Sequence, residues 1–317
     1  MERRIYSCKF IQIDLSLRLR FTQDDKKERM TNNNQNTHNS EEATTAYTES
    51  QEIHHEQTLF AEPIYNYNGC PVTNSLLVSW AVVILIILGS LLLRVLIKKI
   101  PGKIQGAVEM IFEWFLETFD SVTGDRKKSL MFFPLVLSFF VFILFNNWFG
   151  LLPGVGTIGQ VVNEHGNLML IPYLRGGTAD LNTTLALAII AVVASHLFGI
   201  FKIGAWTHFN KFINIKAFLE IPGKIFKDPT IILVNPIKAF VGIVEIVGEI
   251  AKIASLSFRL FGNIFAGEVL LASMAAMVAW LVPIPFMFLE LIVGVVQALI
   301  FALLTLAFLT INTMEEH

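Results

Sequence analysis

Uninterrupted apolar runs are the feature that most constrains the fold of this chain. The stretches near 74–97, 130–152 and 180–201 each approach the ~20 residues that an α-helix needs to cross a bilayer. Inside a bilayer the backbone polar groups must be satisfied within the segment, so such runs form helices. Charged residues make up 16% of the chain, against about 25% in soluble domains. We therefore predict an all-α membrane protein with a single membrane domain over residues 73–317.

The C-terminal part of this domain is predicted to be a long helical hairpin. Its arms are expected near 236–277 and 286–313, with Pro283 and Pro285 making the turn between them. The first arm would extend ~63 Å at ~1.5 Å per residue. Because a bilayer core is about 30 Å thick, this helix must be tilted, bent or overlong.

The segment 104–123 has a different pattern from the spans. Glu109, Glu113 and Glu117 recur every four residues on one helical face, and the apolar residues fall largely elsewhere. An amphipathic helix with this many acids is predicted to lie in the membrane interface instead of crossing it. The prediction is therefore five transmembrane helices plus one membrane-associated amphipathic helix.

The basic residues outside the spans predict the orientation. Lys and Arg concentrate in the segments 94–128 and 202–238, whereas Arg175 is the only Lys or Arg between spans on the opposite side. By the positive-inside rule the two basic segments are cytoplasmic. Five spans then place the N-terminus outside and the C-terminus in the cytoplasm.

Residues 1–72 are polar and carry no clear helical or strand period, so we expect them to be disordered. Met30 opens an Asn-rich stretch and is our preferred start of translation, with a genuine basic leader over 1–29 as the alternative. Cys8 and Cys70 are too few and too far apart to predict a disulfide framework.

The sequence contains no metal-ligand spacing, Gly-rich phosphate loop or nucleophile motif. We therefore predict no metal, no cofactor, no direct nucleotide binding and no nucleic-acid partner. The apolar surface implied by the spans makes membrane lipid the expected environment.

Three charges interrupt the otherwise uncharged region between Ile253 and Met314, namely Arg259, Glu268 and Glu290. A cation near the bilayer centre costs ~2.5–3.5 kcal/mol on insertion scales, so it is seldom retained for packing alone. Such a residue usually faces a protein interface or a water cavity and handles ions.

The helical period places these charges at different depths and on different faces. Glu245 and Asn263 share one stripe of the first arm with Arg259, and Glu268 falls on roughly the opposite face. Along the axis Glu268 lies ~13 Å and Glu245 ~21 Å from Arg259, in opposite directions. In the last helix, Gln297 lies on the same stripe as Glu290.

Simpler interpretations remain open for several of these residues. Arg259 could form a structural salt bridge with Glu268 or Glu290, although buried bridges are doubtful stabilisers and one pair leaves the third charge unexplained. Glu249 could belong to the solvated end of its helix. His196 is typical of a hydrogen-bonded core histidine.

At these residues the chain resembles subunit a of the membrane (Fo) sector of bacterial F-type ATP synthase. The segment SFRLFGNIFAGE matches the central motif of that family, and VVQALIFALLTLAFL, ADLNTTLALA and NNWFGLLP resemble further family segments. The resemblance covers most of residues 74–317. It implies long tilted hairpin helices that face a rotating ring of c subunits, and a b-subunit peripheral stalk as a further partner.

The resemblance also implies functional residues. Arg259 occupies the position of the essential arginine, and Glu290 stands where some relatives have a histidine, so we expect a two-carboxylate outer channel. The implied ion-translocation residues are Glu245, Arg259, Asn263, Glu268, Glu290 and Gln297.

The implied function is that of a non-catalytic stator subunit in the bacterial plasma membrane. Two offset half-channels would carry H⁺, or alternatively Na⁺, to and from the c-ring carboxylates and so couple ion flow to rotation and ATP synthesis. The competing hypothesis is a self-contained ion-coupled transporter. The absence of an inverted repeat or paired broken helices in the sequence disfavours it.

Overall fold

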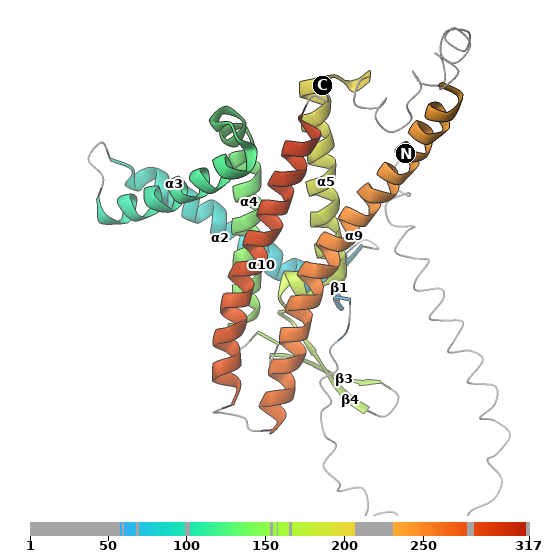
Figure 1. The fold of residues 1–317 in the computed structure, drawn as a ribbon. Coiled ribbons are helices and arrows are strands. Elements are labelled where there is room, and N and C mark those ends of the chain that lie inside the picture. Colours follow the sequence, from blue (N-terminus) through green and yellow to red (C-terminus); the bar gives the residue numbers. More distant parts are fainter. Residues whose placement is uncertain are drawn as a thin grey trace, which may run out of the picture. The chain divides into compact units, whose positions relative to one another are not determined.

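The computed structural model describes residues 58, 60–67, 70–98, 102–152, 155–156, 158–164, 167–206, 231–277 and 282–314. These residues are predominantly helical (Figure 1). The long helices are α2 (Asn74–Leu96), α3 (Lys103–Thr123), α4 (Arg126–Gly150), α5 (Leu181–Ile203), α9 (Ile231–Met277) and α10 (Pro283–Asn312).

Four of the described helices, α2, α4, α5 and α10, are long and apolar enough to cross a membrane. The prediction of a helical, multi-pass membrane protein is confirmed at that level. The fifth span, which we assign to α9, and the interfacial position of α3 stay predictions.

The chain divides into two compact units, and one of them contains all of these helices. The other contains strands that the sequence did not predict. β1 (Pro63–Tyr67) pairs antiparallel with β2 (Cys70–Thr73), and β3 (Gly159–Glu164) pairs with β4 (Asn167–Pro172). The first hairpin lies inside the segment that we expected to be disordered. Residues 1–57 of that segment lie outside the described residues.

Helix α9 has 47 residues and begins earlier than the sequence suggested. At ~1.5 Å per residue it extends ~70 Å, more than twice the thickness of a bilayer core. It runs beside α10 over the part next to their connection and diverges from it toward the other end (Figure 1). Pro283 and Pro285 lie in the first turn of α10, not in the loop. A proline is tolerated there because the first N–H groups of a helix have no intrahelical partner.

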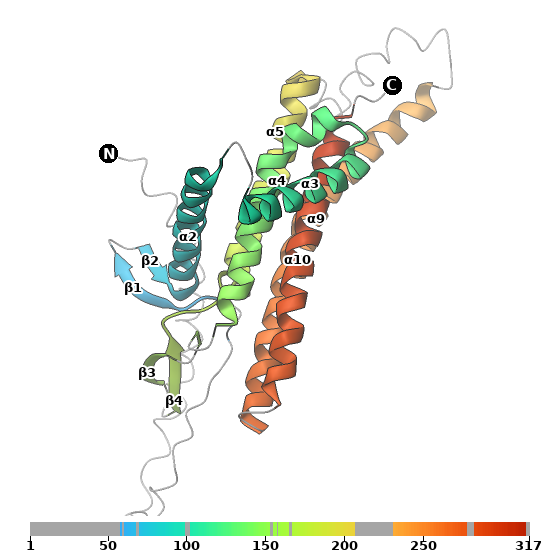
Figure 2. The same ribbon diagram turned by 90° about the vertical axis from the view of Figure 1, so that its left-hand side faces the viewer.

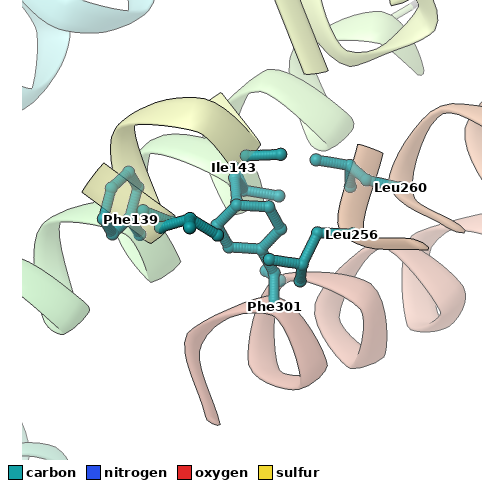
Figure 3. Packing of buried hydrophobic residues seen from close by; sticks show 9 residues of the cluster. Phe139, Ile143, Leu256, Leu260 and Phe301 are labelled. Atoms are coloured by element: carbon teal, nitrogen blue, oxygen red, sulfur yellow. The ribbon is translucent and has the colours of Figure 1, made fainter. Parts of the chain in front are cut away.

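The core that supports α9 comes from three neighbouring helices. Phe139 and Ile143 of α4, Phe301 of α10 and the small residues of α5 pack against Leu256 and Leu260 of α9 (Figure 3). The hydroxyls of Thr184 in α5 and Ser257 in α9 lie 3.3 Å apart within this interface. One face of α9 is therefore fixed by the bundle, which decides where its remaining side chains point.

Helix α3 lies across the long axis of α4 in both views (Figures 1 and 2). The chain changes direction at Gly124, whose φ of 68° is easily adopted only by glycine. Asp125 then caps α4 by accepting a hydrogen bond from the backbone N–H of Lys127. Phe115 and Phe119 bury the apolar face of α3 against α4 and α10.

Candidate functional site

Arg259 lies on the exposed side of α9. Its helical neighbours Leu256 and Leu260 are buried in the bundle, so the residues between them on the opposite side project outward. The Nη2 group of Arg259 donates a hydrogen bond to Ser255 Oγ at 3.3 Å, one turn earlier. Asn263 is exposed one turn later. The arginine therefore lies in a polar stretch of an otherwise apolar exposed face.

Arg259 forms no ion pair among the described residues. The structural-bridge interpretation required a pair with Glu268 or Glu290. Instead, Glu268 Oε2 lies 3.1 Å from Nη2 of Arg175. The charge of Arg259 thus stays available on the exposed face.

Arg175 is the residue that our sequence reasoning used only to predict topology. It follows β4 and precedes the short 3-10 helix η3 (Gly177–Ala179), and its side chain is 5% exposed. Besides Glu268, its Nη1 group donates to Thr58 Oγ1 at 3.2 Å and to the Phe60 carbonyl at 3.4 Å. In the sequence, Arg175 is the only basic residue between spans on its side of the membrane, and this feature could have indicated a specific role.

Glu290 is 8% exposed on α10 and lies against α9. A Cβ at Gly267 of α9 would overlap its carboxyl group, so Gly267 provides the space that the carboxyl occupies. Because Gly267 directly precedes Glu268, both predicted outer carboxylates lie at the same level of the hairpin.

The stripe of α10 that carries Glu290 also faces α4. Asn147 Nδ2 donates to the Gly294 carbonyl at 2.9 Å, and Trp148 Nε1 donates to the Leu291 carbonyl at 3.3 Å. Gln297 is buried two turns after Glu290. The NNWFG segment therefore fixes the position of α10 behind the predicted site.

Replacing Gly267 with alanine is expected to destabilise the protein by about 1–3 kcal/mol, because the new methyl group collides with the Glu290 carboxyl. Gly262 is the matched control on the same helix, since a Cβ there meets no atom within 4 Å. Gly262→Ala should be neutral or stabilise by up to ~1 kcal/mol through helix propensity. Thermal unfolding in detergent measures both. Adding Glu290→Ala should suppress the Gly267→Ala effect, and equal losses in both backgrounds would exclude this contact.

A second polar cluster joins α5, α9 and α10 in the first half of α9. Glu249 Oε1 lies 2.7 Å from Lys252 Nζ, and its Oε2 lies 3.3 Å from His196 Nε2. Lys252 Nζ lies 5.1 Å from the ring centroid of Phe308. The Glu249 side chain is 13% exposed, so the interpretation of it as a solvated helix end is wrong. Glu245, which is half-buried, precedes it by one turn.

The structure thus places the six predicted residues along one hairpin. Glu245 lies in the first half of α9, Arg259 and Asn263 on its exposed middle, and Glu268 beside Gly267 and Glu290 toward the other end. The sequence missed the pairing of Arg175 with Glu268, and the separate cluster of His196, Glu249 and Lys252. Their pairing depends on contacts between helices, which helical periodicity does not encode.

Comparison with known proteins identifies a family. A sequence model of the family described as ATP synthase A chain matches residues 76–310. ATP synthase subunit a of Moorella thermoacetica is 28% identical over 256 residues, covering 80% of this chain and 96% of that protein. The protein of the same name from Syntrophobacter fumaroxidans is 32% identical, covering 73% and 80%. That from Mycobacterium marinum is 34% identical, covering 78% and 91%.

Proposed function

Because this chain belongs to the ATP synthase A chain family, and so to the membrane sector of an ATP synthase complex, we propose that it is the stator subunit carrying two offset ion half-channels. The ions, H⁺ in the first instance, pass through these half-channels to and from carboxylates of a c-subunit ring. The chain itself catalyses no chemical step. It works in the plasma membrane beside the ring and a b-subunit peripheral stalk.

The observation that carries this proposal is the guanidinium of Arg259 on the exposed face of α9, which has no ion-pair partner among the described residues. Exposed side chains beside this face of the helix, such as Phe258 and Val269, are apolar. A face of this kind suits contact with the helices of a partner inside a membrane. The cation then meets any carboxylate that the partner presents at the same depth.

The positive charge of Arg259 acts on the ionisation of a nearby carboxylic acid. A carboxylate about 4 Å from a fixed positive charge gains ~4 kcal/mol of Coulomb attraction at an effective dielectric constant near 20. The ionised form of a ring carboxylate is therefore stabilised beside Arg259, and it releases its ion there. In the lipid the same charge is expensive, so the acid must take up an ion before it leaves the stator.

Arg259 also separates the two half-channels. A fixed cation repels other cations, so ions cannot pass directly between them and must travel on the ring. The membrane potential supplies ~2.3 kcal/mol per charge per 100 mV, which biases the direction of rotation.

The polar groups on either side of Arg259 support the assignment of the two half-channels. Glu245, next to the Glu249 cluster, serves the cytoplasmic half-channel. Glu268 and Glu290 serve the outer one, with Asn263 and Gln297 between them and the arginine. This assignment follows from an N-terminus outside and a C-terminus in the cytoplasm.

The assignment is tested by the side from which aqueous reagents reach each half-channel. In a background with Cys8 and Cys70 replaced by serine, a cysteine at position 245 or 248 should react with a membrane-impermeant thiol reagent from the cytoplasmic side. A cysteine at 268 should react from the outside. A cysteine at the buried position 260 is the control and should react from neither side. Labelling of 245 and 268 from the same side would contradict two offset half-channels.

A further inference from the structure

The outer half of the hairpin contains two carboxyl groups with very different surroundings. Glu268 is 3.1 Å from a guanidinium. Glu290 has no basic residue within ion-pairing distance among the described residues, and its Oε1 atom is buried without a hydrogen-bond partner there. The two acids therefore differ in what a change of charge would do to their neighbours.

Arg175 is held from both sides. Glu268 binds its Nη2, while Thr58 Oγ1 and the Phe60 carbonyl accept hydrogen bonds from its Nη1. A buried guanidinium is tolerated only where its charge is compensated. If Glu268 took up a proton, Arg175 would keep its place but lose its counter-charge, so Glu268 is poorly suited to exchange ions.

The residues that hold Arg175 from the other side belong to a short stretch ahead of the first membrane helix, residues 58 and 60–62, which we term the pre-helix segment. Its Ala61 N–H donates to Asp180 Oδ1 at 3.2 Å, and its Glu62 carbonyl accepts from the Asn74 N–H at 3.2 Å. Asp180 also accepts from Ser75 Oγ at 3.2 Å. The segment is thereby tied to the first residues of α2 and to the N-cap of α5.

Glu290 shows the opposite situation. Its carboxyl occupies the space left by Gly267, beside the backbone of α9. Uptake or release of an ion at this carboxyl breaks no ion pair formed by the described residues. Its buried Oε1, which has no partner among those residues, leaves a position for a proton donor, a water molecule or a cation.

We propose that Arg175 and the pre-helix segment give the two outer carboxyls separate roles. Arg175 is a positioning residue that holds Glu268 as a fixed, paired charge. Glu290 is the carboxyl that exchanges the ion in the outer half-channel. The inference rests on the proposed stator function and adds to it a division of labour that involves a segment outside the membrane helices.

The test is a double-mutant cycle on ion flux through assembled complexes in vesicles, with ring content checked in each preparation. Arg175→Gln should lower flux about tenfold and Glu268→Gln several-fold, because the first removes the counter-charge of the half-buried Glu268 and the second that of the buried Arg175. The double variant Arg175→Gln/Glu268→Gln should recover to within about threefold of wild type, since neither charge remains. Glu290→Gln should lower flux about 100-fold in every background.

The cycle also separates a positioning role from a purely structural one. An arginine needed only for folding would leave the double variant as impaired as Arg175→Gln, and that result would overturn the proposal. If Arg175→Gln does not assemble, the flux of Glu268→Gln is compared with that of Glu290→Gln. Equal losses of flux in these two variants would contradict separate roles for the two carboxyls. Thr58→Val, which removes one acceptor from Arg175, should cause a smaller loss of flux that Glu268→Gln suppresses.

Failure of this inference is distinct from failure of the stator function. Arg259→Ala in the same vesicles reports on the stator function alone. If that variant loses coupling while the cycle at Arg175 and Glu268 is additive, the stator assignment stands and the division of labour is wrong.

Discussion

Replacing Arg259 with alanine is expected to abolish ion-coupled ATP synthesis and ATP-driven pumping in assembled complexes. Among the described residues between Ile253 and Met314, Arg259 is the one cation on the exposed face of α9, and the variant removes it. A loss of ~4 kcal/mol of attraction for a ring carboxylate corresponds to a rate lower by about 10³-fold. Pumping driven by ATP, followed with a pH-sensitive dye in vesicles, measures the effect.

Assembly is expected to persist in Arg259→Ala, because among the described residues the side chain makes a single hydrogen bond, to Ser255. Arg94→Ala is the matched control, since Arg94 is exposed at the end of α2, away from the hairpin. Arg259→Lys should fail or nearly fail, because a compact ammonium lacks the planar fork of the guanidinium. Near-normal coupled pumping in assembled Arg259→Ala complexes would disprove the rotor–stator mechanism.

Loss of both outer carboxyls is expected to have the second-largest effect. The double variant Glu268→Gln/Glu290→Gln should slow ion flux by at least 100-fold, and more than either single variant does. Gln keeps the size of each side chain, but it removes the exchanging carboxyl at position 290 and the charge paired with Arg175 at position 268. Flux through complexes in vesicles, driven by an imposed membrane potential, is the measurement.

The control for this pair is Glu113→Gln, which removes an exposed carboxyl from α3. It should leave flux unchanged, because α3 lies apart from the predicted path. Wild-type flux in the double variant would exclude both Glu268 and Glu290 from ion transport.

Much of the helical architecture could be predicted from the sequence because hydropathy and helical period are local properties. The apolar runs at 74–97 and 180–201 coincide closely with α2 and α5. The same reasoning failed where structure depends on the chain as a whole. The β1–β2 hairpin has short strands without a strong alternating pattern, and the prolines near 283 were assigned to a turn instead of the first turn of α10.

The candidate site also combines features that the sequence predicts with features that depend on how the helices pack. The stripe that carries Arg259 and Asn263 follows from 100° of rotation per residue, so the amino-acid sequence alone is enough to predict it. The Arg175–Glu268 pair joins residues 93 positions apart. No periodicity links a loop residue to a helix at that separation. The contact between the Glu290 carboxyl and Gly267 likewise depends on how two helices pack.

The attachment of α9 to α5 has a mechanical consequence. The Thr184–Ser257 and His196–Glu249 contacts fasten α9 on both sides of the buried Leu256. In the proposed stator role, each passing ring carboxylate pulls sideways on Arg259, and the helix that carries this residue must resist the pull. Two contacts along α9 oppose rotation of the helix about its own axis as well as its translation. The reaction force of each rotary step is then carried by the contacts between α9 and α5 and not by the lipid. Arg259 therefore keeps its position relative to the ring while the ring turns.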